Sequence, residues 1–290
     1  MRAIVCGLAG IGLAAAASAS TLIDFEGPAY SGSAGGTLLT TGFGGGGQNG
    51  WYNPVSGSVD FNVHTYAGNT LGFVNNPNGG KQFVGVAGTA APNNIGRAQR
   101  AHDFSAGGVW TVSWDVIGAY VGPVGTAPIN NLGSFSLQPS TTANFWQQLM
   151  AYGTPADPNM YNIQYGVFTA AGGAAPAFMS AGPEWTNIPS NHWIHQSTTW
   201  DFGTNQLLSV SIQDITAGGA MTTVDVSGMG WYLAGGQNNV LAKAFPTDVR
   251  LFTGNTDNAT GWDNLHIVPA PASLLALGAG LLAAGRRRRA

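Results

Sequence analysis

The residues with the clearest binding chemistry in this chain are aromatic and amide side chains in three short blocks. The blocks are Gly50–Pro54, Phe145–Gln148 and Gly182–Asn187. Saccharide rings stack on aromatic faces, and their hydroxyls bond to amides and carboxylates, so such blocks are typical of sugar-binding sites. The residue types predict a saccharide site that draws on five side chains: Trp51, Tyr52, Trp146, Gln147 and Trp185. The alternative is that these tryptophans lie in the core, like most tryptophans of folded domains.

The sequence lacks the motifs that carry hydrolytic chemistry. Glycoside hydrolysis requires a pair of carboxyl groups, and the chain has two glutamates, Glu26 and Glu184, which are far apart in sequence. The Gly-x-Ser-x-Gly motif of serine hydrolases is absent, and Gly32–Gly35 is similar to it only in composition. We therefore predict that the protein is not an enzyme. The alternative is a glycan hydrolase whose carboxylates converge from distant positions.

His192 and His195 form the densest group of histidines. The residues around them are β-branched and aromatic, which favours a strand. A spacing of three in a strand places two side chains on opposite faces of the sheet, so these rings would not hold one metal ion. The pair therefore predicts no metal centre.

The elements that must position these residues are strands. Trp110, Val112, Trp114 and Val116 alternate with polar residues, as do the apolar residues of Tyr161–Val167, and this period of two indicates strands with one buried face. Further strands are predicted at 21–26, 61–65, 82–86, 135–137, 145–151, 193–202, 206–213, 222–226, 248–253 and 262–268. About a dozen strands without helices predict an all-β fold: a single β-sandwich over residues 20–267, most simply a jelly roll.

The first 19 residues have the features of a secretory signal peptide. Arg2 provides a positive start, residues 3–17 form an apolar run, and 17–19 form a small-residue cleavage site. Export implies the Sec translocon and signal peptidase as partners. Cys6, the only cysteine, would be removed with this segment. The exported chain is therefore expected to lack disulfides, a thiol nucleophile and any Cys-ligated zinc.

An uncharged apolar segment closes the chain and is stopped by four consecutive arginines: Arg286, Arg287, Arg288 and Arg289. Pro269 and Pro271 confine any helix to residues 272–285. That helix would be ~21 Å long, which is shorter than the ~30 Å hydrocarbon core of a bilayer. The length suits a transient membrane segment, and the arginines favour the cytoplasmic side. The rest of the chain is therefore expected outside the inner membrane.

Residues 268–290 resemble the PEP-CTERM sorting tail of exported bacterial proteins. The motif Val268-Pro269-Ala270-Pro271, the apolar helix and the arginine cluster follow one another in the order of that family. The resemblance implies transient anchoring in the inner membrane, cleavage near the motif by an exosortase, and delivery to the cell surface or extracellular matrix. Ala270 stands where the family usually has glutamate. Proteins with this tail are associated with biofilm matrix, so exopolysaccharide is an implied partner.

The charge of residues 20–267 differs from that of the whole chain. This segment contains five basic and 13 acidic residues, a formal net charge of −8 compared with −3 for the full sequence. Nucleic-acid binding requires a basic face, so no nucleic acid is expected as a partner. Glycine is abundant, at 44 of 290 residues, but glycine and proline together stay below the level typical of disordered chains.

Three short blocks resemble known β-sandwiches. Gly47–Tyr52 is similar to a loop of concanavalin-like and laminin-G-like domains, and Leu22–Glu26 with Gly261–Ile267 resembles the paired terminal strands of jelly-roll carbohydrate-binding modules. The resemblance implies that the first and last strands lie side by side, and that a structural calcium joins them. The Glu-x-Asp-x-x-Glu strand of glucanases with this sandwich is absent.

The implied calcium would be held by three carboxylates: Asp24, Glu26 and Asp263. Asp24 and Glu26 are two apart and share one face of a strand. By strict alternation, Asp263 shares the face of Leu265 and Ile267, so it would need a position at the strand end to point outward.

Together these features predict an exported, non-catalytic surface or matrix protein that binds polysaccharide. Two alternatives stay open, the glycan hydrolase and a purely structural matrix component. Burial of the aromatic residues at 51, 146 and 185 would favour the structural component.

Overall fold

The computed structural model describes residues 20–88, 95–123, 131–138, 146–154, 156–168, 176–233, 245–254 and 257–270. In these ranges the helices are three-residue 3₁₀ turns, at Gln48–Gly50, Pro183–Trp185 and Ser227–Met229. None of these has the length or hydropathy needed to span a bilayer.

Most of the predicted targeting segments lie outside the described residues. At the start of the chain this applies to the signal peptide, residues 1–19. At the end it applies to Pro271, to the apolar helix 272–285 and to all four residues of the arginine cluster, Arg286, Arg287, Arg288 and Arg289. The membrane segment and its arginine stop therefore stay predictions from the sequence.

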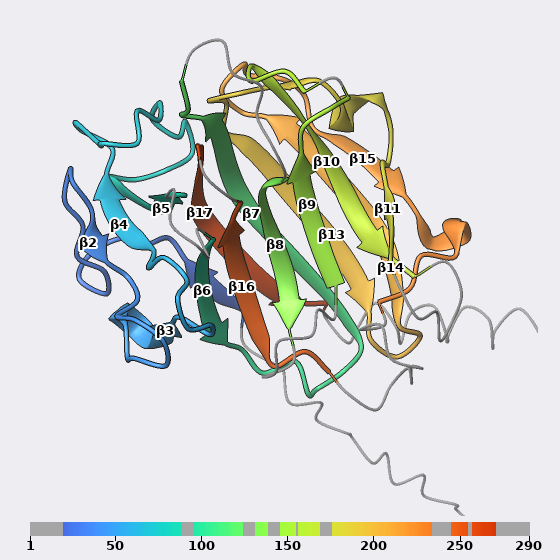
Figure 1. The fold of residues 1–290 in the computed structure, drawn as a ribbon. Helices are drawn as coiled ribbons and strands as arrows, with labels where there is room; N and C mark the ends of the chain where they lie inside the picture. The colour runs from blue at the N-terminus through green and yellow to red at the C-terminus, as the bar shows by residue number, and fades with distance from the viewer. Residues whose placement is uncertain are drawn as a thin grey trace, which may run out of the picture.

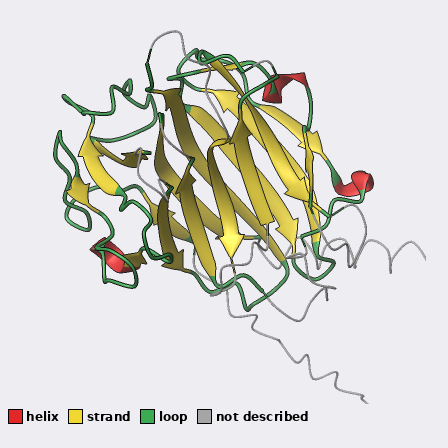
Figure 2. Ribbon diagram, viewed as in Figure 1, coloured by secondary structure: helices red, strands yellow, loops and turns green. Residues whose placement is uncertain are grey.

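Two antiparallel sheets lie face to face in the described part of the chain (Figures 1 and 2). The nine-stranded sheet has the order β15-β14-β13-β7-β17-β5-β4-β2, with β1 beside β17. Its strands are β1 (Thr21–Ile23), β2 (Thr37–Leu38), β4 (Asn62–Thr65), β5 (Gln82–Ala87), β7 (Val109–Tyr120), β13 (Ile194–Asp201), β14 (Gln206–Asp214), β15 (Thr222–Asp225) and β17 (Asn258–Pro269).

The eight-stranded sheet has the order β11-β10-β9-β8-β16-β6-β3, with β12 beside β10. Its strands are β3 (Trp51–Tyr52), β6 (Gly96–Ala101), β8 (Asn131–Gln138), β9 (Trp146–Ala151), β10 (Met160–Val167), β11 (Ala177–Met179), β12 (Ile188–Pro189) and β16 (Asp248–Thr253). These two layers confirm the all-β sandwich predicted from the alternation, and the pairing of Thr21 with Ile267 confirms that the terminal strands are neighbours.

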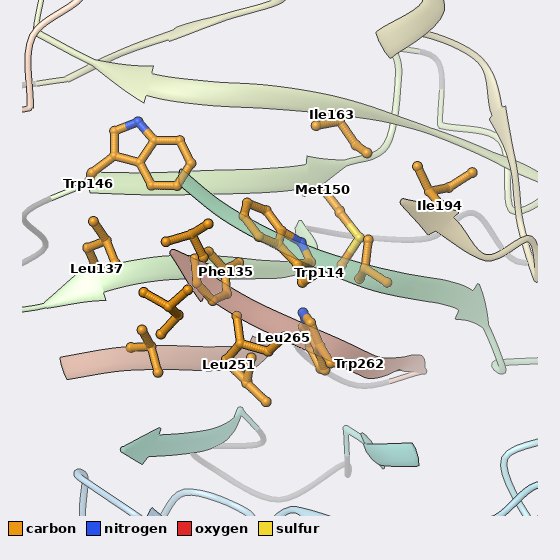
Figure 3. Close-up of a cluster of buried hydrophobic side chains, with 14 of the residues drawn as sticks. Trp114, Phe135, Leu137, Trp146, Met150, Ile163, Ile194, Leu251, Trp262 and Leu265 are labelled. Atoms are coloured by element: carbon orange, nitrogen blue, oxygen red, sulfur yellow. The ribbon is translucent and has the colours of Figure 1, made fainter. Parts of the chain in front are cut away.

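Apolar side chains fill the space between the two sheets, and along each strand they alternate with outward-facing residues. In β13, every second residue from Ile194 to Trp200 is buried, and the residues between them are partly exposed. Trp114 of the nine-stranded sheet stacks on Phe135 of the eight-stranded sheet, with ring centroids 4.1 Å apart (Figure 3). Large aromatic rings of this kind dominate the energetics of a core because each buries extensive apolar area.

A second, smaller hydrophobic cluster lies against the nine-stranded sheet on its outer face. Tyr66, Phe73, Phe83 and Trp193 belong to it. The Trp193 indole nitrogen donates a 2.8 Å hydrogen bond to the Val74 carbonyl. Residues 66–80, called here the covering segment, thereby seal part of this outer face.

The strand β6 was not predicted from the sequence. Its residues, Gly-Arg-Ala-Gln-Arg-Ala, contain no large apolar side chain to produce the usual signal. Ala98 nevertheless points inward and is fully buried, while Arg97 and Gln99 point to the outer face. Because the inward-facing residues of β6 are small, its sequence shows no alternation of large apolar and polar residues, which is the signal used to predict strands.

The last strand extends further than predicted. Val268 pairs with Thr111, and Pro269 pairs with Trp110. The Ala270 amide donates a 2.8 Å hydrogen bond to the Val109 carbonyl. Strand β17 therefore includes Val268 and Pro269 of the sorting-type motif, and Ala270 is bonded to β7.

Candidate functional site

The three tryptophans predicted to bind saccharide are core residues. Trp51, Trp146 and Trp185 are at most 1% exposed. The Trp51 and Trp185 indole nitrogens donate to the hydroxyls of Tyr30 and Tyr165, at 3.1 and 2.6 Å. The prediction is wrong for these three rings, because the strand phase in β3 and β9 turns Trp51 and Trp146 inward and the 3₁₀ turn does the same for Trp185.

The same strand phase places their neighbours Tyr52 and Gln147 on the outer face of the eight-stranded sheet. The register joins them through three further residues. Tyr52 is opposite Gln99, Gln99 is opposite Arg250, Arg250 is opposite Ser136, and Ser136 is opposite Gln147. These five residues are called here the cross-strand row. With strands about 4.8 Å apart, the row is about 19 Å long.

Hydrogen bonds connect three of the five residues of the cross-strand row: Arg250, Gln99 and Tyr52. The Arg250 Nε donates to Gln99 Oε1 at 2.7 Å, and Gln99 Nε2 donates to the Tyr52 hydroxyl at 2.7 Å. That hydroxyl donates to Asp248 Oδ1 at 2.9 Å. Asp248 Oδ2 also accepts a 2.6 Å bond from the Thr247 hydroxyl. The network fixes the rotamers of all these side chains, as a preorganised binding surface requires.

Burial shifts the pKa values of Tyr52 and Arg250. Burial, followed by the hydrogen bond and the charge of Asp248, raises the pKa of Tyr52 to about 12, so the phenol stays protonated. Burial, followed by repulsion from Arg97, lowers the pKa of Arg250 to about 10, which still leaves a cation at neutral pH. At neutral pH the network therefore contains a neutral phenol and a charged guanidinium.

The two ends of the cross-strand row are more accessible than its centre. Gln99, Ser136 and Arg250 are 0%, 2% and 6% exposed, whereas Tyr52 and Gln147 are partly exposed. The row therefore has a buried polar centre and a partly exposed side chain at each end.

The carboxylates predicted to bind calcium are engaged with the chain itself. Asp24 Oδ1 accepts from the Glu26 amide at 3.1 Å, and Glu26 Oε1 accepts from the Lys81 and Gln82 amides at 2.5 and 2.8 Å. Among the residues that the structure describes, no group of three or more His, Cys, Asp or Glu side chains could hold a metal ion. The structural calcium therefore stays a prediction from the resemblance.

A bulge in β17 determines the direction of Asp263. The register of β17 against β7 shifts between Asp263 and His266. Leu265 and Ile267 stay buried in the core cluster. Asp263 points to the opposite face, where it accepts a hydrogen bond from the Tyr66 hydroxyl. Strict alternation gave the wrong face because a bulge adds one unpaired residue and reverses the phase.

Two carboxylates do converge in space, at Asp115 and Asp263, which are opposite each other on β7 and β17. The Asn76 side-chain nitrogen lies 2.9 Å from Asp115 Oδ2 and 3.3 Å from Asp263 Oδ2, and the Tyr66 hydroxyl donates to Asp263 Oδ2 at 2.7 Å. Burial is the main reason that the pKa of Asp263 rises to about 8. Both residues are at most 1% exposed beneath the covering segment, so this pair does not reach a glycosidic bond.

The two histidines contact different carboxylates, and His192 lies before β13 while His195 lies in it. His192 Nδ1 lies 2.7 Å from Asp214 Oδ2, and His195 Nδ1 lies 2.6 Å from Asp115 Oδ1.

No protein-family model matches this chain, and no curated protein matches it. Comparison with solved structures finds low similarity. Peanut lectin in complex with a nine-residue peptide has a TM-score of 0.39 and 12% identity, over 87% of this chain and 98% of that one. Basic winged bean lectin with Tn-antigen has a TM-score of 0.37 and 11% identity, over 71% and 91%.

The binding domain of botulinum neurotoxin serotype G has a TM-score of 0.35 and 10% identity, over 65% of this chain. The match spans 39% of the toxin chain. Similarity at this level identifies neither a family nor a ligand for the protein.

Proposed function

We propose that this chain is an exported, non-catalytic protein of the cell surface or extracellular matrix, and that it binds polysaccharide on the outer face of the eight-stranded sheet. The observation that carries this proposal is the cross-strand row, in which Tyr52, Gln99 and Gln147 are brought into one line from distant parts of the sequence. A line of side-chain donors and acceptors suits an extended chain of hydroxyl-bearing rings.

The chemistry of the cross-strand row favours saccharide over an apolar ligand. Amide, phenol and hydroxyl groups satisfy the hydroxyls of a sugar, whereas burying them against an apolar ligand without partners would be unfavourable. Tyr52 also contributes part of an aromatic face, the group on which sugar rings stack. The partly exposed side chain of Gln147 carries both donor and acceptor atoms.

The export part of the proposal rests on the terminal segments. A signal peptide at 1–19 and a sorting-type tail at 268–290 predict passage through the Sec translocon, transient membrane anchoring and processing by an exosortase. The burial of Trp51, Trp146 and Trp185 favours the structural-matrix alternative over sugar binding by those rings. It does not affect the cross-strand row, which lies on the other face.

The test is a polysaccharide panel with the protein purified from its secreted fraction, read by binding and by release of reducing ends. Saturable binding without release supports the proposal. Release of reducing ends would support the hydrolase alternative and contradict the proposal. Absence of both would favour the structural role. Tyr52→Ala and Gln147→Ala, each checked for folding by circular dichroism, should weaken binding at least about tenfold if their hydrogen bonds contact the ligand.

A further inference from the structure

We propose that a cavity at one edge of the sandwich binds the acetamido group of an N-acetylated amino sugar. The cavity has a volume of about 260 Å³. It is lined by β12 of the eight-stranded sheet and by β13, β14 and β15 of the nine-stranded sheet. This inference goes beyond the proposed function, because the five residues of the cross-strand row do not line this cavity.

The floor of the cavity is the end of the hydrophobic core. Ile188, Ile194 and Ile212 line it, and all three belong to the main core cluster. β12 is only two residues long, so the eight-stranded sheet stops short here and leaves open the space beside these side chains. Pro189, which is exposed, extends the apolar wall to the surface. A branched aliphatic floor suits a methyl group, whereas burying a hydroxyl or an ammonium there without a partner would be unfavourable.

The mouth of the cavity is polar and open to solvent. Glu184 and Asn187 are exposed, and Thr222 is partly exposed. Within the described residues, the side chains of these three residues form no hydrogen bond or ion pair. They provide a carboxylate, an amide and a hydroxyl. An acetamido group needs an acceptor for its N–H and a donor for its C=O, and this set of side chains offers both.

Hydrogen bonds within the chain hold the walls of the cavity in place. On the wall from the nine-stranded sheet, Gln213 Nε2 donates to the Gly219 carbonyl at 2.8 Å. On the opposite wall, the Asn187 amide donates to Asn162 Oδ1 at 2.9 Å. Walls that are already fixed lose little conformational freedom when a ligand binds, which favours binding.

The charges at the cavity favour a neutral ligand. Glu184 and Asp214 both line it, and Asp214 Oδ2 lies 2.7 Å from His192 Nδ1. A fatty acid or an acidic sugar would be repelled by the carboxylate of Glu184. An ammonium group would be attracted to Glu184 but would lose hydration above the isoleucine floor. A neutral acetamido group meets neither obstacle.

The size of the cavity fits one sugar unit better than an extended peptide. Peptides that add to a sheet edge place alternate side chains in separate pockets along the edge. A cavity of about 260 Å³ is instead below the usual range of ~300–1,000 Å³ for drug-sized ligands. The unit that carries the acetamido group would therefore enter the cavity, and the rest of the saccharide would stay outside.

The experiment is saturation-transfer NMR on the protein purified from its secreted fraction, with sugars that differ only at carbon 2. The acetamido probes are N-acetylglucosamine and N-acetylgalactosamine. Glucose and galactose carry a hydroxyl there, and glucosamine and galactosamine carry an ammonium. We expect an acetylated sugar to bind at least about tenfold more tightly than its hydroxyl and ammonium counterparts, with the strongest saturation on its methyl protons.

Three results would overturn the inference. They are equal binding of the hexoses, tighter binding of the amines, and no binding of either acetylated sugar. The first two would show that the isoleucine floor does not select the methyl group. The third would show that the cavity is not a site for this class of ligand.

Two adjacent threonines of β15 provide a matched pair of variants. Thr222 lines the cavity, whereas Thr223 points to the other face of the strand, where its hydroxyl lies 2.9 Å from Ser211 Oγ. Thr222→Val should weaken binding of the acetylated sugar by about three- to tenfold, because one hydrogen bond is lost. Thr223→Val should leave it unchanged. Equal effects of the two variants would contradict the assignment to this cavity.

The comparison of acetylated with unacetylated sugars on the unaltered protein decides the question even if Thr222→Val fails to fold. Failure here is also distinguishable from failure of the proposed function. If polysaccharides bind and the acetylated sugars do not, only this inference fails. If an acetylated sugar binds with its methyl protons saturated, while Tyr52→Ala and Gln147→Ala bind every polysaccharide as well as the unaltered protein does, only the assignment to the cross-strand row fails.

Discussion

The Tyr52 hydroxyl donates a hydrogen bond to Asp248 Oδ1 at 2.9 Å, across 196 residues of sequence. This bond ties the edge strand β3 to β16 over the intervening strand β6. It also occupies the carboxylate that would otherwise neutralise Arg250. Tyr52, Gln99 and Arg250 thus belong to one hydrogen-bonded network that spans three strands.

The first prediction concerns the stability contributed by this bond. Tyr52→Phe should lower the free energy of unfolding by about 1–3 kcal/mol, because Asp248 and Gln99 lose a buried partner. Urea denaturation would measure the change. Tyr232→Phe is the control, because the structure gives the Tyr232 hydroxyl no hydrogen bond within the described residues, and it should stay within about 0.5 kcal/mol of the unaltered protein. Equal effects of the two variants would contradict the assigned bond.

The second prediction compares two adjacent residues of β9. Trp146→Ala should destabilise the fold by about 3–5 kcal/mol, since a large buried ring is removed from the core. Gln147→Ala should change stability by no more than about 1 kcal/mol but weaken polysaccharide binding. Urea titration of both proteins, with binding measured on Gln147→Ala, checks the pair. A larger stability loss in Gln147→Ala than in Trp146→Ala would reverse the inward and outward assignment.

The third prediction is a pH dependence that arises from Asp263. Its folded-state pKa is raised to about 8, above its ordinary value of 3.8, so the folded protein holds a proton that the unfolded chain releases. Stability from this group is therefore complete below about pH 4 and is lost as the pH rises toward about 8. The groups that face it are Tyr66, Asn76, Asp115 and Asn264.

The difference in melting temperature between the unaltered protein and Asp263→Asn isolates this effect, because other titrating groups cancel. Relative to the variant, the unaltered protein should lose stability between about pH 4.5 and about pH 8. A constant difference over this range would show that Asp263 does not hold the proton.

The fourth prediction concerns the end of the domain. A chain that stops after Ala270 should melt at a higher temperature than one that stops after Ile267, since the shorter chain loses the pairing of residues 268–269 with β7 and the Ala270–Val109 bond. Mass spectrometry of the surface form should then find a C-terminus at or beyond Ala270. A surface form that retains Ala290 would contradict processing of the tail.

The sequence predicted the fold better than the site. Long strands such as β7 and β13 can be predicted from the sequence, because one face is buried and the other is more exposed, so apolar and polar residues alternate. A two-residue strand such as β3 carries none, so Trp51 could not be assigned a direction from its neighbours. The Gly-Arg-Ala-Gln-Arg-Ala strand was missed because its inward residues are small.

The cross-strand row depends on register between strands that are far apart in sequence. Gln99 and Arg250 are separated by 151 residues, and their bond follows from the pairing of β6 with β16. Local patterns do not contain that register. Tyr52 and Gln147 were identified as candidates only because they adjoin tryptophans, while Arg250 gave no signal except its rarity in an acidic chain.

The most direct test of polysaccharide binding by this face is hydroxyl-radical footprinting with and without polygalacturonate. Labelling of Tyr52 and Phe252 should fall when the polymer is bound. Labelling of Met221, which is 50% exposed on the nine-stranded sheet side, should stay unchanged. Unchanged labelling of Tyr52 and Phe252 at a saturating polymer concentration, or protection confined to Met221, would contradict polysaccharide binding by this face.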